Sequence, residues 1–236
     1  MHDPTPSHAG TAVVTGGARN LRRAIVLALA SAGFSVMVNT RTDLAAAEEV
    51  ADEARALGAR ALAAIADVTE PPQVAAMMRR AEQLGPVRVL VNNAALRTRV
   101  SVEELTFDQW RAVHAVVLDG AFHCVHAALP AMRAAGSGRI ITIIGANALR
   151  GDPTRVHVSS AKHGLVGMTK ALAAACAADG ITANAVSPGR LNDPDPDIEQ
   201  SHRDRLAQLV AFLASPAAGE ITGQLIESGP PGAAAR

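Results

Sequence analysis

The feature that most constrains the fold of this chain is a repeated alternation of short β-branched runs with longer alanine-rich segments of helical periodicity. Such an alternation is typical of strand–helix–strand units, which place parallel strands in one sheet and helices on both of its faces. Right-handed connections then predict an α/β, doubly wound parallel sheet of about seven strands, with a ligand crevice beyond the carboxyl ends of the strands. The predicted strands are Ala12–Thr15, Ser35–Thr40, Ala61–Ala66, Val87–Asn92, Arg139–Ile144, Thr182–Val186 and Gln224–Glu227.

The same alternation predicts six helices, with no internal repeat and no linker between them. A chain of 236 residues, 49% of them apolar, has enough material for the core of a single domain. We expect a flexible N-terminal arm over residues 1–10, one folded domain over 11–229 and a loose tail over 230–236. The predicted helices span about 21–33, 43–57, 72–84, 106–135, 157–179 and 202–214.

The balance of charges excludes several classes of partner. Lysine plus arginine equals aspartate plus glutamate at 22 each, so no basic surface for nucleic acid or an anionic membrane is predicted. No run approaches the roughly 18 consecutive apolar residues of a membrane span, and the first ten residues lack a signal-peptide pattern. Cys124 and Cys176 fall in predicted helices without metal-ligand spacing. We therefore expect a cytoplasmic protein with small-molecule or protein partners.

The first predicted strand leads into a glycine-rich turn, TGGARNLR, that precedes a helix. Such a turn lets a pyrophosphate approach the backbone N–H groups at a helix N-terminus. The turn resembles the TGxxxGxG motif of the short-chain dehydrogenase/reductase family, with Gly16 retained and Asn20 and Arg22 at the other two glycines. Asparagine tolerates a left-handed conformation. Arg22 obstructs helix packing or the phosphates, pairs with a phosphate or carboxylate, or is simply a solvated surface arginine.

Further matches to this family cover nearly the whole chain, from about Thr11 to Gly229, in the order that the family has them. The resemblance implies a Rossmann-like fold and a descent from 3-oxoacyl or other carbonyl reductases. The matching segments are Asp67-Val68 for the adenine-side pair, Asn92–Ala95 for NNAG, Asn184–Gly189 for NxVxPG, and 212–215 with 221–223 for the C-terminal signature.

The cofactor that the resemblance implies is a nicotinamide dinucleotide. The second strand ends in Asn39-Thr40-Arg41, without a carboxylate for a ribose 2′-hydroxyl. Arg19 and Arg41 are placed to meet a 2′-phosphate, so any bound dinucleotide is expected to be NADP, although both arginines also fit a structural surface role. The expected cofactor-binding residues are Gly16, Arg19, Leu21, Asn39, Arg41, Asp67, Val68 and Asn93.

The catalytic groups of the family are an asparagine, a serine, a tyrosine and a lysine, and the resemblance retains only the lysine, as Lys162. The tyrosine position falls on Val158, the serine position on Gly145 and the asparagine position on Val117. The chain contains no tyrosine at all. Because valine cannot transfer a proton, the usual hydride-transfer chemistry is expected to be lost or nearly so.

Two more departures and one retained feature predict a non-catalytic subunit. The position of the family's carboxamide-binding threonine falls on Asp193, and the segment 190–211 is shorter than the family's usual substrate lid. In the family, the long helices expected here at 106–135 and 157–179 pair across a two-fold axis, and an inactive copy can keep that self-complementary patch. The leading hypothesis is a pseudoenzyme subunit that supports an active family member in a hetero-oligomer.

Two other kinds of function stay open at this stage. One is an enzyme, either an atypical NADP-dependent carbonyl reductase or a lyase or isomerase that works through Lys162. An apolar pocket would lower the pKa of this lysine and make it a base or a Schiff-base former. The other is a binding module that senses a nucleotide through Asp67, Asn93 and Arg41.

Alternative catalytic groups are present in the same region of the sequence. His157 or His114 would supply an acid that titrates near neutrality, although His157 lies about 100° around the helix from the tyrosine position. The SxxK tetrapeptide Ser159–Lys162 places a hydroxyl and an amine at the spacing of a hydrolase dyad. His123 and His126 beside a cysteine suggest a metal, but no third ligand is apparent, which favours a helix-surface role.

Overall fold

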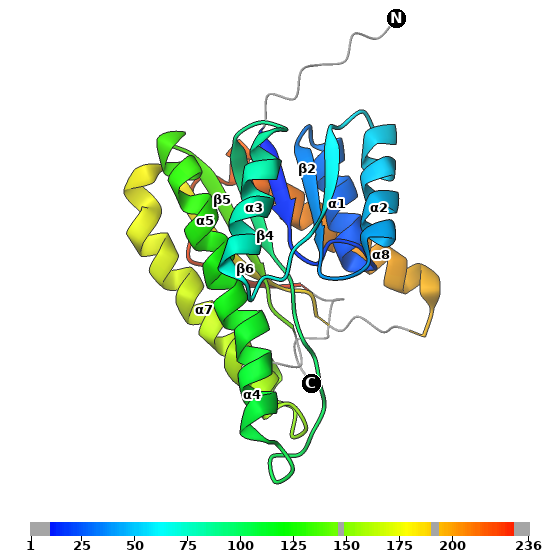
Figure 1. The fold of residues 1–236 in the computed structure, drawn as a ribbon, viewed down its shortest axis with the longest axis vertical. Helices are drawn as coiled ribbons and strands as arrows, with labels where there is room; N and C mark the ends of the chain where they lie inside the picture. Colours follow the sequence, from blue (N-terminus) through cyan, green and yellow to red (C-terminus); the bar gives the residue numbers. More distant parts are fainter. Residues whose placement is uncertain (1–9, 146–148, 190–193, 229–236) are drawn as a thin grey trace, which may run out of the picture.

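The computed structural model describes residues 10–145, 149–189 and 194–228. The seven strands of this part of the chain form one parallel sheet in the order β3-β2-β1-β4-β5-β6-β7 (Figure 1). The predicted doubly wound sheet of seven strands is therefore confirmed. Residues 1–9, the tail 230–236 and Asp193 lie outside the described residues. The strands are β1 (Thr11–Val14), β2 (Ser35–Thr40), β3 (Ala61–Ile65), β4 (Val87–Asn92), β5 (Gly138–Ile143), β6 (Ile181–Ser187) and β7 (Leu225–Glu227).

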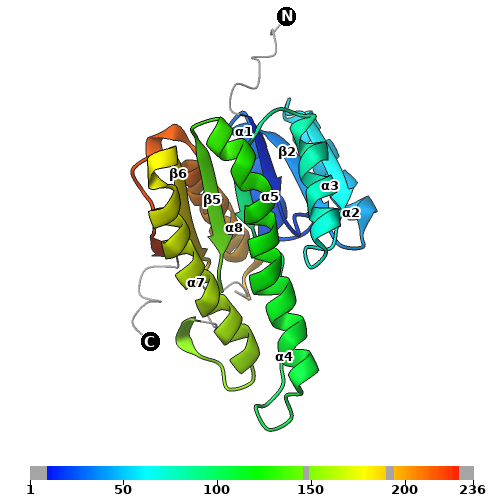
Figure 2. The same ribbon diagram turned by 60° about the vertical axis from the view of Figure 1, so that its left-hand side comes forward.

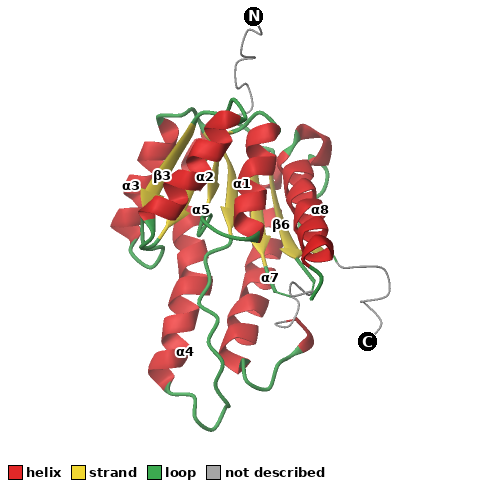
Figure 3. Cartoon of the chain, turned by 90° about the vertical axis from the view of Figure 1, so that its right-hand side faces the viewer, coloured by secondary structure: helices red, strands yellow, loops and turns green. Residues whose placement is uncertain are grey.

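Helices cover both faces of the sheet (Figures 2 and 3). The helices α1, α2 and α8 pack on one face, and α3, α5 and α7 pack on the other. They are α1 (Leu21–Ser31), α2 (Leu44–Ala56), α3 (Pro71–Glu82), α4 (Phe107–His114), α5 (Gly120–Ala134), α7 (Val156–Cys176) and α8 (Pro196–Ala214), with short turns η1 (Ala115–Asp119), η2 (Ala177–Asp179) and η3 (Pro216–Ala218).

The central strands are apolar throughout because both of their faces are buried. In β1, Ala12 and Val14 contribute to the core under α1, α2 and α8, whereas Val13 points into the core under α3, α5 and α7. All four residues of β1 are buried. This two-sided burial explains why the sequence shows continuous apolar runs rather than an alternation of apolar and polar residues.

The long helix predicted over 106–135 is divided in the structure. Thr106 caps α4 through a capping box with Gln109, and the π-helical turn η1 separates α4 from α5. The π turn covers only five residues, too few to interrupt the helical periodicity of the whole segment, so the sequence predicted one helix. The helix over residues 107–134 is long and apolar enough to span a membrane, by length and composition only. Its residues Cys124 and Met132, however, lie in the protein core, as in the core helix of a globular domain.

The prediction that the last helix begins at residue 202 is wrong, because α8 begins at Pro196. The side chain of Asp195 accepts hydrogen bonds from the N–H groups of Asp197 and Ile198, and proline occupies the first turn. Proline and acidic residues at a helix start are favourable, since the proline has no N–H group to leave unpaired and the acids meet the positive end of the dipole. The helix thus takes up most of the segment 190–211, which was expected to be shorter than the family's substrate lid.

Candidate functional site

A large cavity lies beyond the carboxyl ends of β1, β2, β3 and β4, where the order of the strands reverses. Its volume of about 410 Å³ is in the range of small-molecule sites. Six of the eight predicted cofactor-binding residues line this cavity, namely Gly16, Arg19, Asn39, Arg41, Asp67 and Val68. These six residues, which are far apart in the sequence, therefore lie together around one cavity.

The turn after β1 is held by Asn39 of β2. Asn39 is buried, and its Oδ1 accepts a hydrogen bond from the N–H of Gly16 at 3.2 Å while its Nδ2 donates to the carbonyl of Ala66 at 3.0 Å. Gly16 has a φ of 63°, which glycine adopts without strain. Asn39 therefore acts as a brace that fixes the floor of the cavity.

Asn20 is the only non-glycine residue with positive φ in the described part of the chain. Its φ of 53° agrees with the left-handed region that the sequence suggested, but its ψ of −134° lies outside that region. Only glycine adopts such a combination readily. Asn20 precedes α1 without a side-chain capping bond, so no hydrogen bond of that kind compensates the strain.

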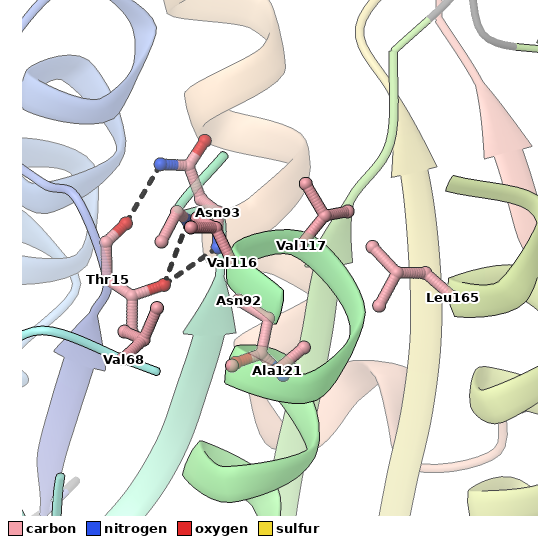
Figure 4. Close-up of a pocket in the computed structure, with 10 residues that line it drawn as sticks. Thr15, Val68, Asn92, Asn93, Val116, Val117, Ala121 and Leu165 are labelled. Carbon is pink, nitrogen blue, oxygen red and sulfur yellow. Dashed lines mark hydrogen bonds between the residues drawn. The ribbon is translucent and has the colours of Figure 1, made fainter. Parts of the chain in front are cut away.

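The two remaining predicted cofactor residues, Leu21 and Asn93, are placed in the protein interior. Asn93 donates from its backbone N–H to Thr15 Oγ1 and from its Nδ2 to the carbonyl of Thr15, both at 2.9 Å (Figure 4). These bonds join the ends of β1 and β4. Leu21 is 6% exposed and belongs to the core under α1. Both residues shape the cleft rather than line its large cavity.

At the outer end of the cavity, Arg19 forms an ion pair with Asp43. Asp43 also caps α2 by accepting the N–H of Ala46, and this bond, followed by that from Arg19, lowers the pKa of the carboxyl. Sequence reasoning missed Asp43 as a cavity residue, although an aspartate directly before an alanine-rich run is a helix-start signal. Arg41 has no ion pair in the described residues, so it remains available to an anionic ligand.

Asp67 and Val68 form the opposite wall of this end of the cavity. Asp67 Oδ1 accepts hydrogen bonds from the N–H and the Oγ1 of Thr69, at 2.9 and 2.8 Å, which fixes the orientation of the carboxylate. Val68 is buried against Gly120 of α5, where a Cβ atom would approach Val68 Cγ2 to 2.6 Å. The wall is therefore tightly packed and preformed.

The retained lysine of the expected catalytic set lies deep inside the protein. Lys162 is 3% exposed, and its Nζ donates a hydrogen bond to the carbonyl of Ile143, at the end of β5, at 2.7 Å. Burial, followed by repulsion from Arg97 and Arg22, lowers the pKa of Lys162 to about 7. The lowered pKa agrees with the expectation for a lysine in an apolar pocket. Lys162 is not among the residues that line the large cavity.

Aliphatic side chains fill the space around this lysine. Val117 and Val158 are 1% and 5% exposed and belong to one apolar cluster with Leu165 (Figure 4 shows Val117 and Leu165). The structure thus brings the predicted asparagine and tyrosine positions together. At Gly145, the predicted serine position, an added Cβ would meet nothing within 4 Å. These positions present no proton donor among them.

The alternative catalytic groups are engaged otherwise or lack the required contacts. His157 is fully buried, its Nε2 lies 2.8 Å from Thr98 Oγ1, and burial, followed by repulsion from His114 and Arg155, lowers its pKa. A lowered histidine pKa favours the neutral imidazole, which is a poor acid. Ser159 Oγ has no hydrogen-bond partner among the described residues, so the structure does not form the hydrolase dyad with Lys162.

His114, His123 and His126, the other histidines considered as catalytic or metal-binding groups, also have structural partners. His114 Nδ1 lies 3.0 Å from the carbonyl of Trp110, and the rings of these two residues stack on each other. His123 Nδ1 lies 3.0 Å from the carbonyl of Val68, and the ring of His126 stacks on Phe122. Within residues 10–145, 149–189 and 194–228, no three histidine, cysteine or acidic side chains gather as a metal site would require.

Arg22, at the position of the third motif glycine, points into the cleft and is not a solvated surface arginine. Its side chain is half-buried, lines the large cavity, and donates from Nη1 to the carbonyl of Gly16 at 3.4 Å. Burial and the nearby Arg97 lower the pKa of Arg22. The arginine therefore occupies space that a glycine would leave open for a ligand.

Known proteins resemble this chain over nearly its full length. A family profile described as short chain dehydrogenase matches residues 10–204. A D-beta-hydroxybutyrate dehydrogenase of Rhizobium meliloti is 36% identical over 186 residues, or 78% of this chain and 72% of that protein. A 3-oxoacyl-acyl-carrier-protein reductase of Staphylococcus epidermidis is 35% identical over 92% of this chain and 96% of its own. The crystal structure of acetoin dehydrogenase from Enterobacter cloacae matches with a TM-score of 0.87 and 30% identity, over 93% of this chain and 94% of the other.

Proposed function

The chain belongs to the short-chain dehydrogenase family, and from that premise we propose that it is a non-catalytic member that supports an active relative as a subunit of a shared oligomer. The observation that carries this proposal is that the residues next to Lys162 include no suitable proton donor in the described part of the chain. Reduction of a carbonyl group produces an alkoxide that needs a proton, and the residue one helical turn before Lys162 is the buried, aliphatic Val158. The neutral His157 does not replace it.

We further propose that the outer half of the cleft binds the adenosine part of a nicotinamide cofactor. The cavity of about 410 Å³ and its preformed walls support this proposal. Gly16, Asp67 and Arg41 would hold this part, and Arg41 would favour the 2′-phosphate of NADP over the hydroxyl of NAD. The inner half fits a nicotinamide poorly, because Arg22 extends into it.

An exposed apolar face supports the proposed subunit role. Phe107 at the start of α4 is 74% exposed, and Phe122 on α5 is 55% exposed. Large aromatic side chains at the surface often mark protein interfaces. We propose that this face of α4 and α5, together with α7, packs against the corresponding helices of an active family member.

Co-expression tests the subunit proposal. The chain is produced with an intact short-chain dehydrogenase from the same genome, and the two are analysed by affinity purification and size-exclusion chromatography. We expect a complex of defined stoichiometry that Phe122→Asp weakens, while Leu57→Asp, an exposed leucine at the end of α2, leaves it unchanged. A stable homotetramer of the chain alone, with no association with any intact homologue, would contradict the proposal.

A second candidate function rests on the lowered pKa of Lys162. An amine that titrates near 7 is a competent base or imine-forming nucleophile at neutral pH. A lyase or isomerase activity, or an atypical NADP-dependent reduction with the ammonium as proton donor, would use this property. Reduction with borohydride in the presence of small aldehydes and ketones should then label wild type and leave Lys162→Ala unlabelled. No labelling of either protein would eliminate the imine-forming branch.

A further inference from the structure

A long irregular segment, residues 93–106, joins β4 to α4, and we call it the strap. It runs between α4 and α7 (Figure 3). Leu96 of the strap lines the large cavity and also packs against the aliphatic cluster that contains Val117 and Val158. The strap therefore lies between the cavity and the buried inner half of the cleft, which holds Lys162.

Two polar contacts hold the strap against the start of α7. Thr98 Oγ1 lies 2.8 Å from Nε2 of His157, in the first turn of α7. The N–H of Val100 donates to the carbonyl of Thr154, in the loop before the helix, at 2.9 Å. Thr154 is itself fixed, because its N–H and Oγ1 both donate to Asp152 Oδ1. Of the two contacts, only the one made by Thr98 involves a titratable side chain.

The surroundings of His157 suit a neutral imidazole. His157 is fully buried, and its Nδ1 has no hydrogen-bond partner in the described part of the chain. A neutral imidazole carries a proton on one nitrogen, whereas the protonated ring carries one on each. Protonation would therefore leave a charged N–H at Nδ1 buried without an acceptor, which is unfavourable.

The charged groups near His157 add to this effect. They come from the strap, from α4 and from the segment before α7, and are Arg97, Arg99, His114, Asp152 and Arg155. Asp152 is the carboxylate of this set, and it is already used, because it pairs with Arg155 at 3.6 Å and accepts two hydrogen bonds from Thr154. The two glutamates of the strap, Glu103 and Glu104, are exposed at its turn.

The pKa of His157 gives the direction of the resulting pH dependence. Burial, followed by repulsion from His114 and Arg155, lowers this pKa from its ordinary value of 6.5 while the strap is closed. With the strap open, the imidazole meets water and regains the ordinary value. The open form therefore binds the proton first as the pH falls, so the closed form is favoured above pH 6.5 and loses stability below it. Below the lowered pKa both forms are protonated, and the effect levels off.

We propose that Thr98 and His157 form a pH-sensitive latch, which keeps the strap closed while His157 is neutral and releases it when His157 is protonated. Release opens a path from the large cavity to the aliphatic cluster and to Lys162. The latch operates whether or not the chain is catalytic, so it does not depend on the proposed subunit role.

Hydrogen–deuterium exchange of the backbone amides of the strap, measured by mass spectrometry, tests the latch. In wild type, exchange corrected for its intrinsic pH dependence should be about three- to tenfold faster at pH 5.5 than at pH 7.5. The upper bound follows from linkage, since one pH unit below the pKa of the open form changes the opening equilibrium by at most about tenfold. Peptides from β2 should show no such change.

Variants assign the effect to His157. His157→Gln keeps a polar group that does not titrate, so its strap should exchange at the same corrected rate at both pH values. His163→Gln, which changes an exposed histidine of the same helix, should keep the wild-type effect. Lys162→Met should keep it too, although Lys162 also titrates near neutrality. Thr98→Val removes the latch contact and should exchange faster than wild type already at pH 7.5.

Equal corrected exchange of the wild-type strap at both pH values, or an undiminished pH effect in His157→Gln, would overturn the proposal. Urea unfolding at pH 7.5 shows whether His157→Gln is folded. If it is not, an NMR titration of wild type decides, because the ring proton of His157 and the methyl group of Thr98 should change over the same pH range. A strap that opens while His157 is still neutral would equally overturn the latch.

Discussion

The outer and inner halves of the cleft differ in the polarity of their side chains and in how open they are. The outer half, around Asn39, Arg41 and Asp67, is polar and opens into a cavity of about 410 Å³. The inner half, around Val117 and Val158, is buried and largely aliphatic, with Arg22 and Lys162 as its charged side chains. The outer half is shaped by hydrogen bonds that also hold the sheet together, so folding alone preserves it. Proton transfer depends on single side chains, which the fold itself does not require, so the valines and the glycine at the expected catalytic positions are compatible with an intact fold.

The largest expected effect comes from rebuilding the inner half. Gly145→Ser, Val117→Asn and Val158→Tyr together restore the missing polar groups, but Arg22 still occupies the inner cleft. We expect NADPH-dependent reduction of small ketones, measured by absorbance at the nicotinamide band, only when Arg22→Gly is added. A positioned general acid contributes about 100-fold or more, so the fourfold variant should exceed wild type by at least that factor.

The matched control for this experiment combines the same three changes with Arg79→Gly. It should remain at the wild-type level. Equal activity of the threefold and fourfold variants would show that Arg22 does not obstruct the inner cleft. The missing proton donor alone would then explain why the inner half does not support reduction.

The second effect concerns the pH dependence of stability. The pKa of Lys162 is about 7 in the folded chain and 10.5 for an ordinary lysine. Between these values the unfolded chain binds more protons, so the free energy of unfolding should rise with pH, by about 1.4 kcal/mol per unit between pH 7 and 9. Below pH 7 both states are protonated and this contribution stays constant. Urea unfolding of wild type and Lys162→Met should show the slope only in wild type.

Lys170→Met provides the control for this slope, because Lys170 is an exposed lysine on the same helix. It should keep the wild-type rise of stability with pH. If the free energies of unfolding of wild type and Lys162→Met changed with pH in parallel, Lys162 would not be desolvated in the folded chain. The inner half would then differ less from the solvated outer half.

The third effect tests the outer half through Arg41. Arg41→Ala should weaken NADPH binding about tenfold, the equivalent of about 1.4 kcal/mol for a charge-assisted bond to a 2′-phosphate. Binding of NADH, which lacks this phosphate, should change less than twofold. Fluorescence titration of both nucleotides measures the two affinities. Equal losses for NADPH and NADH would mean that Arg41 shapes the loop rather than reads the phosphate.

The smallest effect lies at the junction of the two halves, at Asn20. Its φ of 53° and ψ of −134° suit glycine. Asn20→Gly should therefore raise the free energy of unfolding by about 1 kcal/mol, since relief of strain exceeds the added chain entropy. Asn20→Ala keeps the strain and should not stabilise the chain. Equal stabilities of the glycine and alanine variants in urea would contradict the strained conformation.

The sequence predicted the fold well because apolar periodicity records burial directly. Every predicted strand and helix is present, and strands such as Ser35–Thr40 have the predicted bounds. The early start of α8 escaped prediction because its first turns are highly charged and contain prolines, as loops often do. The π turn η1 escaped prediction because it is too short to interrupt the helical periodicity of the segment around it.

The site was predictable only in part. Motif positions placed Gly16, Arg41 and Asp67 at one cavity, because these positions follow strands whose carboxyl ends meet at one edge of the sheet. The ion pair between Arg19 and Asp43, and the hydrogen bond from Lys162 to the carbonyl of Ile143, join groups far apart in the sequence. No local pattern encodes such contacts, so only the folded structure reveals them.

The central claim is the proposal that no group in the described part of the chain is positioned to protonate an alkoxide, and the rate of NADPH oxidation by the purified chain tests it most directly. The protein must be free of host reductases and assayed with a panel of small ketones. The account predicts a rate equal to that of a buffer blank. Turnover at an ordinary enzymatic rate, on the order of 1–1000 per second, that copurifies with the chain would contradict it.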